Sequence, residues 1–217
     1  MGFELSNRIQ LKSQYYPLMR DKIGNLLVRF CKGKGKEIPE SFALKLLFMV
    51  DLTSVMKTGV PITFIDYFAY QRGPVATDVH YVLKCEFKKH KVDEKIKLSH
   101  FVEVFKEEEK PQTTTHFKIK ALTSFDEMIF SDYEISIIDE VMLKYGNKSA
   151  NSLSNLTHEI GSLWDKARIN NNLDAYFALN KCSHSDFPVH FTELIDTPAK
   201  TRAYQNAKYS LEYLSAF

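Results

Sequence analysis

The spacing of apolar residues predicts that most of this chain is helical. Apolar side chains recur at helical intervals over six stretches: residues 13–31, 39–59, 74–90, 132–146, 152–168 and 197–217. The second stretch is apolar on nearly every side, so we expect a central buried helix there. The fourth has the clearest start, because Ser131 at the N-cap and Glu134 three residues later form the pattern of a capping box. A short helical turn is expected at 172–180.

Alternation of apolar and polar residues predicts a small amount of sheet. HFVEVF and THFKIKAL alternate within residues 100–121, which indicates a β-hairpin with the polar segment EEEKPQ as its turn. The second half of ITFIDYFAYQ is aromatic and β-branched, so we expect another strand that ends at YQRGPV. A new helix is expected from Pro74 to about residue 90, since proline is tolerated in a first helical turn. The fold class is therefore α+β: a predominantly helical single domain with an antiparallel sheet of about three strands.

Composition narrows the class of protein without naming a function. The chain has 217 residues, 44% of them hydrophobic, and a net charge of +2, so no strong charge draws it toward nucleic acid. Its three cysteines, Cys31, Cys85 and Cys182, have no regular spacing, which argues against a disulfide framework and fits a reducing cytoplasm. The first residues lack the pattern of a secretory signal, and no apolar run is long enough to span a membrane.

Three groups of metal-capable or basic residues are interpreted as ordinary surface features. Cys182, His184, Asp186 and His190 lie within nine positions, but their order matches no common zinc template, so a surface loop is favoured over a metal site. The lysines in KCEFKKHKVDEKIK lack the arginines and interleaved aromatics of a nucleic-acid site, and we interpret them as a solvated helix end. KGKGKE lacks the P-loop spacing and is interpreted as a flexible basic linker.

The sequence allows three different roles for His158. It precedes Glu159, but a zincin helix needs a second histidine where this chain has Ser162. A structural hydrogen bond, a contact with a partner and a chemical role all remain open, in that order of preference. Because no nucleophile–base pair accompanies His158, we expect neither an enzyme nor a cofactor.

Three segments, taken in order, resemble the Panacea (SocA-like) antitoxin domain family, which includes phage-associated GepA-like members. LKLLFMVDL resembles the family's K-L-L-Y-x-x-D helix, and GVPITFIDYFAYQRGPV resembles its segment G-x-P-[IL]-T-x-x-x-[FY]-x-A-x-x-x-G-P-V. FSDYE and the later LSNLTHEIGSLW resemble its closing helices. The resemblance divides the chain into an N-terminal helix and basic linker (1–38), a Panacea-like domain (39–168) and a C-terminal helical extension packed on that domain (169–217).

The resemblance implies an antitoxin that neutralises a cognate protein toxin of a bacterial or phage system by direct binding, as a heterodimer or a larger complex. It supplies no toxin contacts, so we infer them from residue type. Tyr70, Arg72 and His158 are the expected partner-binding residues, since tyrosine and arginine are favoured in interfaces. Gly73, Pro74 and Trp164 are interpreted as structural. The alternatives are a metal-binding or nucleic-acid-binding accessory protein, or an enzyme that uses His158.

Overall fold

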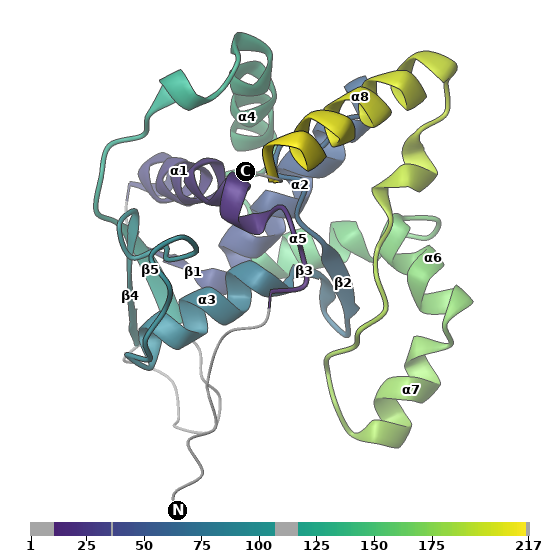
Figure 1. Cartoon of the computed structure of the whole chain (residues 1–217). Helices are drawn as coiled ribbons and strands as arrows, with labels where there is room; N and C mark the ends of the chain where they lie inside the picture. The colour runs from purple at the N-terminus through teal and green to yellow at the C-terminus, as the bar shows by residue number, and fades with distance from the viewer. Residues whose placement is uncertain (1–10, 36, 107–116, 216–217) are drawn as a thin grey trace, which may run out of the picture.

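The fold is built around one central helix, α2 (Glu40–Thr58), as Figure 1 shows. The computed structural model describes residues 11–35, 37–106 and 117–215. Every side chain of α2 from Phe42 to Asp51 is buried, which confirms the central helix expected from its apolar sequence. The other α-helices are α1 (Tyr16–Lys34), α3 (Thr77–Phe87), α4 (Asp132–Tyr145), α5 (Ala150–Thr157), α6 (Leu163–Asn170), α7 (Leu173–Asn180) and α8 (Pro198–Ser215), and short 3-10 helices are η1 (Glu127–Ile129) and η2 (Phe191–Leu194).

Two antiparallel sheets flank this helical core, so the α+β class is confirmed. The first sheet has the order β1-β5-β4, and the second is the hairpin β2-β3. The strands are β1 (Ile38–Pro39), β2 (Tyr67–Tyr70), β3 (Gly73–Ala76), β4 (Val102–Lys106) and β5 (Phe117–Ala121). The expected hairpin of residues 100–121 is the pair β4 and β5, and its expected turn EEEKPQ lies outside the described residues.

The expectation of a helix from Pro74 is wrong. The strand expected before YQRGPV is confirmed as β2, but it pairs with β3 and not with the larger sheet. Pro74 lies in β3, opposite Ala69, and the following helix begins only at Thr77. The Ala69 N–H donates to Phe187, on the far side of β2, so the ladder needs no N–H from Pro74. The third strand of the larger sheet is instead β1, which pairs with β5.

The start of α4 follows the sequence pattern, whereas the single helix expected over 152–168 does not exist. Ser131 and Glu134 form the full capping box. The later stretch is two helices, α5 and α6, separated by a turn in which Gly161 has a φ of 81°. Ser162 caps α6 with its side chain, and Ile160 is 99% exposed although it fits the apolar spacing.

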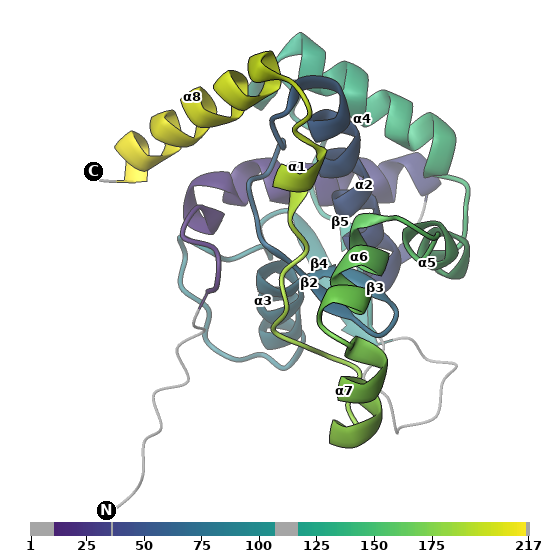
Figure 2. The same ribbon diagram turned by 90° about the vertical axis from the view of Figure 1, so that its right-hand side faces the viewer.

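The two ends of the chain pack differently. Helix α1 buries Ile23, Leu27 and Phe30 against the core and continues to Lys34, so the basic linker is shorter than expected. Helix α8 lies across the same end of the molecule as α4 (Figure 2), and Leu211 is its one buried residue. In the described part of the chain, no helix is long and apolar enough to cross a membrane.

Candidate functional site

The segment Tyr70–Gly73 forms the tip of the β2–β3 hairpin. Tyr70 pairs with Gly73, so Gln71 and Arg72 are the two residues of the turn. Gly73 has a φ of 107°, and a Cβ built on it would lie 2.6 Å from Thr157 Oγ1 and 2.8 Å from Lys45 Nζ. Only glycine fits this position, because a side chain would meet both the backbone strain and the neighbouring atoms.

The carbonyl of Arg72 accepts two hydrogen bonds from the core side of the hairpin. Lys45 Nζ donates to it over 2.6 Å from α2, and Ser154 Oγ donates over 2.7 Å from α5. Lys45 is buried, and this burial lowers the pKa of its ammonium to about 8. A charged donor on a buried helix thus fixes the position of the turn.

The two preceding carbonyls are held by the motif of α5 and α6. Trp164 Nε1 donates to the carbonyl of Tyr70 over 2.8 Å, and His158 Nε2 lies 3.2 Å from the carbonyl oxygen of Gln71. His158 Nδ1 lies 2.5 Å from the carbonyl oxygen of Ser154, and its ring centroid is 3.8 Å from that of Trp164. A carbonyl oxygen only accepts a hydrogen bond, so His158 donates to the carbonyl that faces its protonated nitrogen: Ser154 within α5 or Gln71 in the hairpin.

The segment that carries Cys182, His184, Asp186 and His190 supports the other side of the hairpin. Hydrogen bonds run from Gln71 N to the Ser183 carbonyl, from Ala69 N to the Phe187 carbonyl, and from Val189 N to the Tyr67 carbonyl. These contacts make residues 183–189 a strap along β2. Within residues 11–35, 37–106 and 117–215, no three His, Cys, Asp or Glu side chains are placed to hold a metal ion.

A pocket of about 400 Å³ opens beside the hairpin tip, and we call it the hairpin pocket. Its walls include Glu40, Lys45, Tyr70, Arg72, His80 and Ser154. Tyr70 is half-buried, and burial together with Tyr81 raises its pKa, so the phenol stays neutral. The Arg72 side chain is exposed, and no described residue forms an ion pair or hydrogen bond with its guanidinium. Glu40, by contrast, is already paired with His80, 2.5 Å away.

The base of the same hairpin is fixed by Asp51, a residue to which the sequence reasoning gave no role. Its fully buried carboxylate accepts hydrogen bonds from Ile62 N (2.8 Å), Thr63 N (2.9 Å), Thr63 Oγ1 and Tyr67 Oη (2.9 Å). Burial raises the pKa of Asp51 to about 6, against the lowering effect of these donors. Lys45 was missed likewise. Lys45 and Asp51 could both have been noticed as charged residues inside an otherwise apolar helix, because a buried charge requires a partner.

The structure brings most of the expected residues together. Tyr70, Arg72, Gly73, His158 and Trp164 meet at the hairpin tip, although they come from segments more than eighty residues apart. Pro74 also lines the hairpin pocket, as part of β3 rather than of a helix. The lysine run begins in α3, and its last member, Lys97, pairs with Glu94.

The arrangement defines a class of protein: a helical domain that presents a β-hairpin turn, clamped from within by side chains of three helices. A family model, described as "Antitoxin SocA-like, Panacea domain", matches residues 44–165, which is more than half of the chain. The protein therefore belongs to the SocA-like Panacea antitoxin family, and the resemblance inferred from its motifs is confirmed. No curated protein and no solved structure matches the chain.

Proposed function

We propose that this protein is an antitoxin that binds a cognate protein toxin in the cytoplasm and neutralises it by covering its active surface. The family membership supports the class of function. The observation that carries the mechanism is the contrast at the hairpin tip: three consecutive carbonyls are fixed from within, while the Arg72 guanidinium outside has no partner among the described residues. A rigid turn lowers the entropy cost of binding, and arginine is favoured at binding hot spots.

The interface extends beyond one side chain. A stable complex buries about 1,600 Å² in total, so the toxin would cover the tip, the hairpin pocket and the nearby surface of α5. The pocket receives one toxin side chain between Tyr70 and Arg72. His158, expected from sequence to touch a partner, serves in this proposal mainly to position the turn, because both of its ring nitrogens already face carbonyls. Both ring nitrogens point at carbonyl oxygens, and His158 does not line the hairpin pocket, so we propose a binding protein and not an enzyme.

The test is a toxicity-rescue assay with the gene adjacent to this one. We expect the neighbouring protein to arrest growth when expressed alone, and co-expression with this chain to restore growth. The two proteins are expected to co-purify at a fixed ratio. A harmless neighbour, or rescue without a physical complex, would contradict the proposal.

A further inference from the structure

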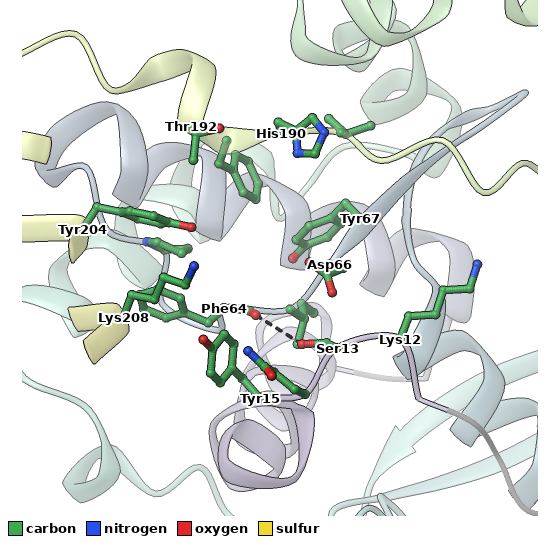
Figure 3. Close-up of a pocket in the computed structure, with 15 residues that line it drawn as sticks. Lys12, Ser13, Tyr15, Phe64, Asp66, Tyr67, His190, Thr192, Tyr204 and Lys208 are labelled. Atoms are coloured by element: carbon green, nitrogen blue, oxygen red, sulfur yellow. Dashed lines mark hydrogen bonds between the residues drawn. The ribbon is translucent and has the colours of Figure 1, made fainter. Parts of the chain in front are cut away.

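A second pocket lies at the opposite end of the β2–β3 hairpin, and it involves none of the residues proposed to contact the toxin. We call it the α8 pocket; its volume is about 360 Å³, within the range of ligand sites (Figure 3). Its walls come from residues 12–15, the loop 61–67, residues 189–192 and helix α8. Four stretches that lie far apart in sequence thus form one concave surface.

Aromatic rings form much of its wall. Phe64 and Tyr204 stack with centroids 6.0 Å apart and an interplanar angle of 25°, and Tyr15 meets the edge of Phe64 at 6.2 Å. Tyr67 and Phe191 form a second pair at 5.4 Å. The face of an aromatic ring carries partial negative charge, so such walls attract organic cations.

Asp66 supplies an exposed carboxylate to the α8 pocket. No described residue forms a hydrogen bond or an ion pair with it. In Figure 3 its carboxylate lies between Ser13 and Tyr67, and Tyr204 and Lys208 enter from the other side of the pocket. Desolvation, with a smaller contribution from the Asp78 carboxylate, raises the pKa of Asp66. A cation placed beside Asp66 would compensate both effects.

The two lysines at this pocket, by contrast, already have acidic neighbours. The Lys12 ammonium pairs with Asp186, lies 4.1 Å from the centroid of Phe68 and points away from the centre of the pocket. Lys208 Nζ lies 3.9 Å from a carboxylate oxygen of Glu212. His190 also lines this pocket and has a smaller, opposite effect on the pKa of Asp66, but no hydrogen bond or ion pair joins the two side chains. Asp66 is therefore the carboxylate of this pocket that no described cation pairs with directly.

The backbone beside Asp66 is held in an unusual conformation. Phe64 has a φ of 51°, which is rare for a bulky residue and persists only where neighbours enforce it. The N–H groups of Ile62 and Thr63 donate to Asp51 and so fix the chain immediately before Phe64. Ser13 Oγ lies 3.4 Å from the Phe64 carbonyl oxygen. Such local strain is common at ligand-binding sites, where it fixes a side chain in place before the ligand arrives.

We propose that the α8 pocket binds an organic cation, with its guanidinium or ammonium group against Asp66 and its carbon chain beside Phe64 and Tyr204. The same chemistry is offered by an arginine or lysine side chain of another protein and by a free small amine. The proposal does not rest on the antitoxin function, because it uses a different surface and different residues.

The experiment is a calorimetric titration of the full chain with N-acetyl-arginine amide, and with the matching citrulline compound as a neutral control of nearly the same shape. We expect saturable binding of the arginine compound and at least about tenfold weaker binding of the citrulline compound. Equal binding of the two compounds, or no saturable binding of either the arginine compound or agmatine, would overturn the proposal.

Single substitutions test whether the arginine compound binds at the α8 pocket. Asp66→Asn should weaken binding of the arginine compound by about tenfold, and Tyr204→Ala by about threefold. Asp132→Asn, at an exposed aspartate in the first turn of α4, serves as the matched control and should leave binding unchanged. Undiminished binding by a folded Asp66→Asn variant would place the cation elsewhere. Agmatine distinguishes the sources: tighter binding of agmatine than of the arginine compound indicates a free amine, and the reverse indicates a protein side chain.

Discussion

The tip and the base of the β2–β3 hairpin are fixed by opposite charges from one helix. At the tip, the ammonium of Lys45 donates to the Arg72 carbonyl; at the base, the carboxylate of Asp51 accepts hydrogen bonds from four donors of residues 62–67. The tip has further side-chain donors in Ser154, His158 and Trp164, whereas at the base a single carboxylate accepts all four hydrogen bonds. Helix α2 is thus both the centre of the core and the element that sets the position of the hairpin. The two ends of the hairpin should respond differently to mutation.

Loss of the carboxylate at the base should have the largest effect. Asp51→Ala leaves buried donors without an acceptor, each at a cost of about 1–3 kcal/mol, so we expect the free energy of unfolding to fall by about 4 kcal/mol. Urea denaturation measures this. A loss below about 1 kcal/mol would show that the base has other support.

Substitution of the glycine at the tip should rank second. Gly73→Ala places a Cβ against Thr157 and Lys45 and forces alanine to a φ of 107°, so we expect a loss of about 3 kcal/mol. Gly161→Ala is the matched control, since Gly161 also has a positive φ (81°) but open space around it, and it should cost only about 1 kcal/mol. Equal losses in the two variants would mean that close packing at Gly73 is unimportant.

Removal of the lysine should cost less than either, because Ser154 still donates to the same carbonyl. For Lys45→Met we expect a loss of about 1–2 kcal/mol, since the hydrogen bond disappears together with the penalty of burying a charge. Faster amide exchange at Gln71, Arg72 and Gly73 should accompany it. Exchange rates that stay unchanged would assign the rigidity of the tip to Ser154, His158 and Trp164 alone.

The two charges should also give pH effects of opposite sign. Lys45 has a folded-state pKa of about 8, below its ordinary 10.5, so the unfolded chain binds more protons in this window and stability gains as pH rises from about 8 to 10.5. Asp51 has a folded-state pKa of about 6, above its ordinary 3.8, so its contribution to stability decreases as pH rises from about 4 to 6. Lys45→Met should remove the upper change and keep the lower one. Identical alkaline profiles for the wild type and Lys45→Met would refute the assignment.

The sequence predicted local structure well and long-range pairing poorly. The capping box could be recognised from the sequence because its two partners, Ser131 and Glu134, lie only three residues apart. The position of Pro74 in a strand could not be predicted, because Gly-Pro is typical of a turn. β3 tolerates the proline because the Ala69 N–H donates to the carbonyl of Phe187, a residue far along the chain. The break between α5 and α6 was hidden by apolar spacing that continues through Ile160.

In the candidate site, too, individual residues could be predicted but their long-range contacts could not. Family motifs pointed to His158 and Trp164, and residue type pointed to Tyr70 and Arg72, but composition and spacing do not reveal that three neighbouring carbonyls are held together. Lys45 was visible as a charge in an apolar helix, yet its acceptor lies 27 residues away and depends on the hairpin. Contacts of this kind depend on tertiary structure, so local sequence patterns do not predict them.

If the hairpin tip contacts the toxin through Arg72, loss of this side chain should raise the dissociation constant of the purified complex with the neighbouring protein. For Arg72→Ala we expect a rise of at least about thirtyfold, as for a binding hot spot, with the melting temperature unchanged because the side chain is exposed. Arg202→Ala, at an exposed arginine of α8, is the control and should bind as the wild type does. An Arg72→Ala variant that binds as tightly as the Arg202→Ala control would show that Arg72 is not a toxin contact.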